Sequence, residues 1–190
     1  MEELTLLNDS TDTLDAILSF HAGMGAEDAH AWTSMLVEMI EKWAFSRGFG
    51  FDFLHQEPDR DGMRSASIKV LGHCAYGLLK SEQGIHRLIR IPPGSKDGRR
   101  HLSLASIHVH PVDRIDSKIP STSYPDCPVC TDGSKEVVGN VQLTQIRSYT
   151  LDPIKSVRDH RTNFQTAEAD KVLSGDLDVL IQRYLQWTTK

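Results

Sequence analysis

The chain of 190 residues is 39% hydrophobic and 25% charged, which is ordinary for a globular protein and sufficient for a core in one or two small domains. Its net charge of −5 argues against a uniformly basic nucleic-acid binder but leaves room for a local basic patch. The sequence has no apolar run long enough for a membrane span, an acidic start unlike a signal peptide, and only three cysteines. We therefore expect a cytoplasmic protein with no membrane association.

The first half of the chain alternates strand and helix patterns. An apolar run at residues 15–22, ending at glycines, predicts a strand. From residue 27 to residue 45 the apolar side chains recur at helical spacing, which predicts a helix with Trp32 and Trp43 on its buried face. Further segments with strand or short helix patterns follow at residues 50–57, 65–71, 74–79, 86–91 and 102–110.

The second half begins with a break in every periodicity. Residues 113–141 are rich in proline, glycine and small polar residues, which predicts a linker or loop. A strand pattern resumes at residues 141–150, and apolar residues at helical spacing over residues 177–185 predict a final helix. The fold class is α+β, with a single sheet and packed helices, divided into residues 1–112, the linker 113–141 and a C-terminal segment 142–190.

Several motifs occur in a fixed order along the chain. They read HAGMGAEDA at 21–29, YGLLKSEQGIHRLIR at 76–90, GRRHLS at 98–103, QIRSY at 145–149 and DHRT at 159–162. These motifs resemble those of the class I peptide chain release factors, and the UGA-reading bacterial type most of all. The resemblance covers residues 20–112 and 142–187.

The resemblance implies both an architecture and a loss. In this family the two matching blocks fold together as one decoding-site body, so residues 142–190 are expected to pack against residues 15–112. Between the blocks the family carries a catalytic domain whose Gly-Gly-Gln loop triggers ester hydrolysis in the ribosome. No Gly-Gly-Gln occurs in this sequence, so we expect a protein that docks without hydrolysing and is not an enzyme.

A basic stretch is the first candidate site. Its members are Arg87, Arg90, Lys96, Arg99, Arg100 and His101, and the C-terminal segment could extend it with Arg147, Arg158, His160 and Arg161. Arginine suits RNA because its planar fork can bind two phosphate oxygens at once, and histidine can stack on a base. The alternative interpretation is a solvated hairpin with surface ion pairs.

The codon-reading positions of the family are altered in this stretch. The place of a Ser-Pro-Phe tripeptide is held by Pro92, Pro93 and Gly94, and the threonine that follows the family's histidine is Leu102. Two hydroxyl groups and an aromatic ring that the family uses are therefore missing. Since base discrimination depends on such partners, we expect codon specificity to be lost or greatly weakened.

Two cysteines and two histidines form a second candidate site, for structural zinc. Cys127 and Cys130 make a Cys-x-x-Cys pair, and His108 and His110 alternate on one strand, so their side chains project from the same face. The family has no such cysteine pair, which makes a zinc ion at the site of the missing domain a hypothesis. A zinc shared across a dimer, or two surface histidines with two free thiols, are the alternatives.

Three functions remain open. The first is a release-factor-like protein that binds the ribosome, through rRNA or mRNA, without peptidyl-tRNA hydrolysis, and that blocks termination or recognises stalled ribosomes. The second is an RNA-binding protein that acts off the ribosome. The third is a partner subunit of a two-part release factor, with hydrolysis supplied by a separate protein chain. None of the three needs a small-molecule substrate.

Overall fold

The computed structural model describes residues 6–7, 9–93, 95, 98–112, 137–138, 141–142 and 144–189. The first part of the chain forms η2 (Ser10–Thr13), β1 (Asp15–Ala22), α1 (Ala26–Ser46), β2 (Gly50–Asp59), β3 (Gly62–Leu71), α2 (Ala75–Leu79), η3 (Lys80–Glu82), β4 (Gly84–Arg90) and β5 (His101–Val112). The later part forms β6 (Val137–Val138), β7 (Val141–Gln142), β8 (Gln145–Thr150), β9 (Ser156–Asp159), β10 (Gln165–Thr166), α3 (Ala169–Leu173) and α4 (Asp178–Thr188). Within these described ranges, no helix combines the length and apolar character needed to cross a membrane.

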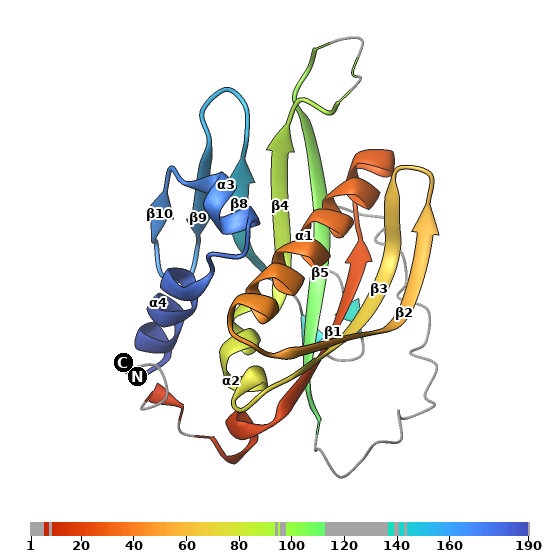
Figure 1. Cartoon of the computed structure of the whole chain (residues 1–190). Helices are drawn as coiled ribbons and strands as arrows, with labels where there is room; N and C mark the ends of the chain where they lie inside the picture. Colours follow the sequence, from red (N-terminus) through yellow and green to blue (C-terminus); the bar gives the residue numbers. More distant parts are fainter. Residues whose placement is uncertain are drawn as a thin grey trace.

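One eight-stranded sheet organises the molecule, in the order β10-β9-β8-β4-β5-β1-β3-β2 (Figure 1). Neighbouring strands run antiparallel except β4 and β8, which are parallel. Strand β8, from the C-terminal segment, therefore lies beside β4 and continues the sheet on the side away from β5. This arrangement confirms the α+β class and the expectation that the two segments fold together as one body.

Helix α1 covers one face of the sheet, as Figure 1 shows. Trp32 and Trp43, the two tryptophans of the predicted apolar stripe, are both 0% exposed. They belong to one core with Leu18 of β1, Ile68 of β3 and Ile107 of β5. The predicted helix is confirmed, because its apolar spacing turns one continuous face toward these strands.

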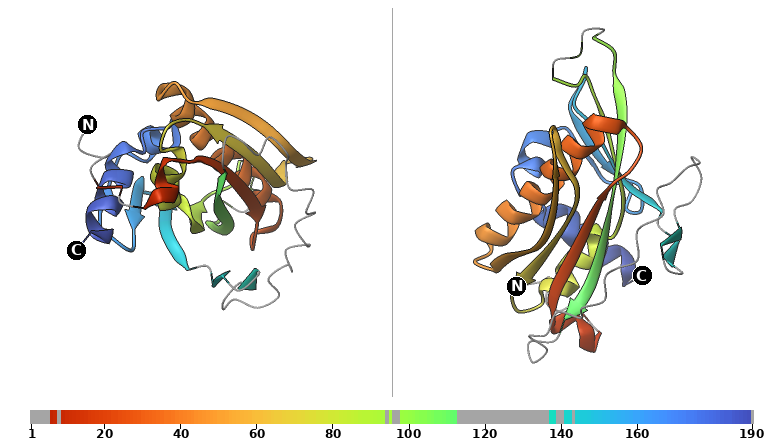
Figure 2. Two further views of the ribbon diagram at one scale, coloured as in Figure 1. Left: turned by 90° about the horizontal axis from the view of Figure 1, so that it is seen from below. Right: turned by 90° about the vertical axis from the view of Figure 1, so that its right-hand side faces the viewer.

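The opposite side of β1 and β5 carries a small separate hairpin. The views of Figure 2 place α1 and the β6–β7 hairpin on opposite sides of these two strands. Strands β1 and β5 pair along their whole shared length, from Asp15 opposite Val112 to Ala22 opposite Ala105. Each residue of these two strands therefore points either toward α1 or away from it.

Residues 151–176 hold elements that the sequence pattern did not predict. Strands β9 and β10 and helix α3 have four, two and five residues. Segments this short do not complete a periodic pattern, so periodicity could not find them. The two strands extend the sheet, because β9 pairs with the edge of β8 and β10 pairs with β9.

Candidate nucleic-acid interface

The β4–β5 connection forms a projecting tip at one end of the sheet (Figure 1). Arg99, Arg100 and His101 are all exposed there, and the two arginines make no hydrogen bond or ion pair with a described residue. Pro93 and Leu102 are exposed and Pro92 is half-buried, while Gly94 and Lys96 lie outside the described residues. The tip thus presents two guanidinium groups, neither paired with a described residue, beside an imidazole, a combination that suits phosphates and bases.

A polar clamp holds one side of the tip's base. Asp28, in the first turn of α1, accepts hydrogen bonds from Arg90 Nε at 3.0 Å and from its terminal nitrogen at 2.7 Å. Its other oxygen accepts a bond of 2.6 Å from the hydroxyl of Ser103. Arg90 therefore orients the hairpin, because its side chain is only 12% exposed and its charge is already compensated.

The turn before α1 brings the helix close enough for this clamp. Gly25 has φ +125°, and a Cβ added there would lie 2.8 Å from the Cα of Ser103. Only glycine tolerates both the positive φ and the close approach. The Gly-x-Gly of the sequence is thus explained by packing of the helix start against β5.

A second contact holds the other side of the base. The backbone N–H of Ile91 donates to the Asp152 carboxylate at 2.9 Å, and the N–H of Leu151 donates to the carbonyl of Ile89 at 2.9 Å. Leu151 and Asp152 both belong to the loop between β8 and β9. The C-terminal segment therefore supports the tip that the N-terminal segment forms.

Arg147 corrects the predicted set of RNA contacts. It lies on β8 and is 0% exposed, so its guanidinium cannot contact RNA, and the prediction for this residue is wrong. Its terminal nitrogens donate to the two oxygens of Glu82 at 2.6 and 2.8 Å. Arg147 lies two residues before Tyr149, so the two side chains share one face of the strand. This spacing from an aromatic residue is the signal that could have predicted the burial of Arg147.

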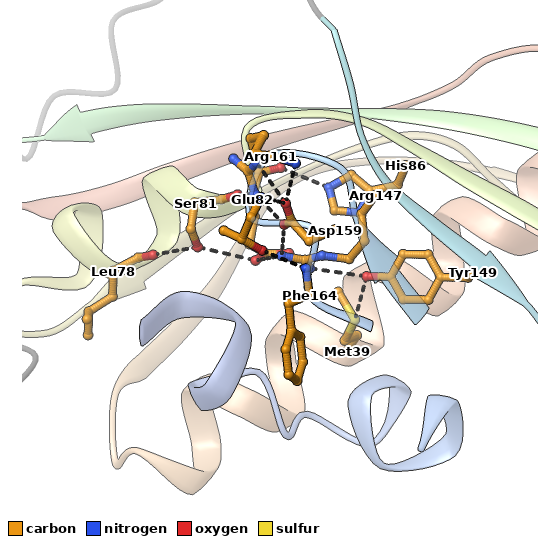
Figure 3. A network of polar contacts seen from close by, with 11 residues as sticks. Met39, Leu78, Ser81, Glu82, His86, Arg147, Tyr149, Asp159, Arg161 and Phe164 are labelled. Carbon is orange, nitrogen blue, oxygen red and sulfur yellow. Dashed lines mark hydrogen bonds and ion pairs between the residues drawn. The ribbon is translucent and has the colours of Figure 1, made fainter. Parts of the chain in front are cut away.

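Arg147 belongs to a buried, charge-balanced network that joins the two segments (Figure 3). Asp159 lies 3.4 Å from Arg147 and 2.8 Å from Arg161. Arg161 also donates to the carbonyl of Ser81 at 2.7 Å, and its guanidinium lies 4.3 Å from the ring centre of Tyr184. With 15% of its side chain exposed and these partners, Arg161 serves packing between the segments.

Burial and pairing shift the pKa values of this network. Burial alone would raise the pKa of Glu82 and Asp159, but the adjacent arginines more than offset it, and both carboxyls have a pKa below their ordinary values. Burial lowers the pKa of His86 to about 4. The pair Glu82 and Asp159 therefore stays ionised opposite two arginines, while His86 is neutral at pH 7.

Arg87 differs from the other predicted arginines. It is half-buried on β4, and its buried Nε has no hydrogen-bond partner among the described residues. It alternates with His86 and Leu88, which are 0% exposed and face the core. Arg87 therefore points to the face of the sheet away from α1.

Two of the four predicted zinc ligands, His108 and His110, are among the described residues. His108 and His110 lie on β5, pointing away from α1, and burial lowers the pKa of His108 to about 4 with further contributions from His21 and His110. Cys127 and Cys130 lie outside the described residues, and the described part holds no group of three or more potential metal ligands. The four-ligand zinc site stays a prediction, which metal analysis of the purified protein would test.

Comparison with known proteins agrees with this geometry. The PCRF domain family matches residues 1–107. Peptide chain release factor 2 of Listeria monocytogenes serotype 4b is 30% identical over 246 residues, covering 95% of this chain and 67% of the relative. The corresponding protein of Pseudothermotoga lettingae is 32% identical over 245 residues, with the same coverages.

A solved structure shares the fold. RF2 of Thermus thermophilus superimposes with a TM-score of 0.80 at 27% identity, over 98% of this chain and 71% of that one. The alignment of 246 residues exceeds the 190 residues of this chain by 56, so at least 56 aligned positions of the Listeria protein have no counterpart here. The matching motifs, the shared sheet and these coverages together show that the chain belongs to the class I peptide chain release factor family.

Proposed function

We propose that this protein binds the ribosome as a release factor does but does not hydrolyse peptidyl-tRNA. The observation that carries the proposal is an eight-stranded sheet, with an exposed basic tip clamped at its base, in a chain whose sequence has no Gly-Gly-Gln. The body that would dock is present, whereas the loop that performs hydrolysis in the family is missing. Such a protein would occupy the decoding site and block termination or recognise a stalled ribosome.

The chemistry of the tip supports docking through phosphates. Arg99 and Arg100 are exposed, and neither is neutralised by a described carboxylate. Contacts of this kind release counterions from RNA, so binding should weaken steeply with salt. The substituted positions Pro92, Pro93 and Leu102 carry no side-chain hydrogen-bonding group, which supports docking by shape and charge with weakened codon reading.

Co-sedimentation with ribosomes at low and moderate salt is the first test. We expect the wild-type protein to pellet at low salt, to dissociate at moderate salt, and to be displaced by an intact release factor. The double variant Arg99→Ala, Arg100→Ala should lose about 1.4–1.8 units of the salt slope. Arg60→Ala is the matched control, because Arg60 is also exposed but lies on the β2–β3 turn at the far edge of the sheet.

A peptide-release assay on stop-codon complexes tests the second half of the proposal. The protein alone should release no peptide and should slow release by an intact factor in proportion to its occupancy. Release of peptide would contradict the proposed loss of hydrolysis. Absence of pelleting at both salt concentrations would contradict ribosome docking and favour an RNA target off the ribosome or a protein partner.

A further inference from the structure

A row of polar residues crosses four adjacent strands on the face of the sheet away from α1. The register places Arg87 of β4 beside Ser148 of β8, Ser148 beside Arg158 of β9, and Arg158 beside Gln165 of β10. Figure 1 shows these strands lying side by side. Since strands are about 4.8 Å apart, the two arginines start about 10 Å from each other.

The alternation of buried residues fixes the side of the sheet on which this row lies. Ser148 sits between Arg147 and Tyr149, and Arg158 sits between Val157 and Asp159; all four flanking residues are 0% exposed. Neighbouring side chains on a strand point to opposite faces, so Ser148 and Arg158 point away from the core. Arg158 is exposed, and Ser148 is half-buried.

A hydrogen-bonded cluster forms around Ser148, the residue that lies between the two arginines in the strand register. A register shift between β4 and β8 lets Gln145 reach Ser148, whose hydroxyl lies 3.0 Å from the Gln145 amide nitrogen. His160 Nε2 lies 2.7 Å from the same hydroxyl and 3.2 Å from the amide nitrogen. The hydroxyl of Ser148, the amide group of Gln145 and the imidazole of His160 therefore lie within hydrogen-bonding distance of one another.

Apart from one buried carboxylate, the charged side chains of these strands are all positive. Strands β4, β5, β8 and β9 contain a single carboxylate, Asp159, which is buried in the ion network with Arg147 and Arg161. Among the residues that the structure describes, the buried Nε of Arg87 has no hydrogen-bond partner, and Arg158 makes only a 3.5 Å contact with the amide oxygen of Asn163. Within the described part of the chain, no carboxylate neutralises either of these guanidinium groups.

From this juxtaposition we infer a second RNA-backbone site, the row Arg87–Ser148–Arg158 with His160. Its ligand class is a chain of phosphodiesters, because the positive groups are spaced along a line and the intervening groups can donate hydrogen bonds to anionic oxygens. Arg87 lies three residues before Arg90, so the row begins about 10 Å along β4 from the clamped base of the tip. The inference deepens the proposed function and rests on it for the identity of the RNA.

The test uses the full chain and a fluorescent 12-nucleotide oligouridylate, measured by anisotropy over a range of salt concentrations. The variant Arg87→Ala, Arg158→Ala should bind about tenfold more weakly and lose about 1.4–1.8 units of the salt slope. Because Arg87 is half-buried, the single variant Arg158→Glu, at an exposed position, repeats the test without disturbing packing. Arg60→Glu is its control, with the same change of charge at the far edge of the sheet.

The outcomes separate this site from the docking function. Weaker RNA binding by both row variants, with the control unchanged, supports the site even if the wild-type protein does not pellet with ribosomes. Equal affinity and slope in the row variants and wild type overturn the site, even if ribosome docking through the tip succeeds. Absence of any RNA binding by the wild type at low salt, or an equal loss in Arg60→Glu, also overturns it.

Discussion

The tip between β4 and β5 and the buried network beside β8 use the same residue type in opposite ways. Arg99 and Arg100 are exposed and have no partner among the described residues, whereas Arg147 is 0% exposed and held by Glu82 and Asp159. Arg99 and Arg100 can bind an external anion, while the charge of Arg147 is compensated by carboxylates inside the protein. An arginine in a family motif is therefore not by itself evidence of contact with RNA.

The network also explains how two separate segments form one sheet. Glu82 comes before the segment 113–136, and Arg147, Asp159 and Arg161 come after it. Their ion pairs are added to the parallel pairing of β4 with β8. The network thus holds the C-terminal segment in the position from which its β8–β9 loop supports the tip.

The largest expected effect comes from breaking this network. Arg147→Met should lower the free energy of unfolding by about 3–5 kcal/mol, because it leaves Glu82 and Asp159 buried with less compensating charge. Urea unfolding measures it. Arg158→Met, one strand away on the exposed face, should change the free energy of unfolding by less than about 0.5 kcal/mol. Equal effects of the two variants would show that the network does not hold the segments together.

Acid should weaken the same region before it affects the tip. The pKa of His86 is about 4 in the folded protein against an ordinary value of 6.5, so the unfolded chain binds more protons between these values. Stability contributed by neutral His86 is present above pH 6.5 and falls as the pH drops toward 4. Between pH 7 and pH 5 the loss should be roughly 2 kcal/mol.

The variant His86→Gln isolates this contribution. Glutamine cannot titrate in this range but can still donate to the Glu82 carbonyl that His86 Nε2 reaches at 2.9 Å. Its unfolding free energy should therefore depend less on pH between 7 and 5 than that of the wild type. Glu82 and Asp159 have lowered pKa values, so their own losses come at lower pH. Parallel pH profiles for both proteins would contradict the role of His86.

A smaller effect is expected at the clamp between the two regions. Ser103→Ala removes the 2.6 Å hydrogen bond to Asp28 and should cost about 1.5 kcal/mol of unfolding free energy. Ser106→Ala on the same strand is a matched control, because the buried Ser106 hydroxyl has no hydrogen-bond partner in the described part of the chain. Thermal unfolding of both variants measures the difference. If the control is the less stable of the two, the hydrogen bond does not stabilise the base of the tip.

The smallest stability effect should be at the tip itself. Arg99→Ala with Arg100→Ala should leave the unfolding free energy within about 0.5 kcal/mol of wild type, because both side chains are exposed and neither is paired with a residue that the structure describes. Of the variants in this Discussion, the same double variant should show the largest loss of ribosome binding. A marked drop in the melting temperature would mean that these arginines have a structural partner.

The sequence by itself determined the family, the α+β class, the position of α1 and the absence of Gly-Gly-Gln. Motif order and apolar periodicity are local properties, so they can be read without knowing which strands meet. The separation of Arg99 and Arg100 from Arg147 was not accessible in that way. It depends on β8 pairing with β4, which carries Arg147 into the core and leaves Arg87, Ser148 and Arg158 in a row on the other face. Only the tertiary register decides which charges are buried together and which face solvent, because burial and pairing are set by neighbours distant in the chain.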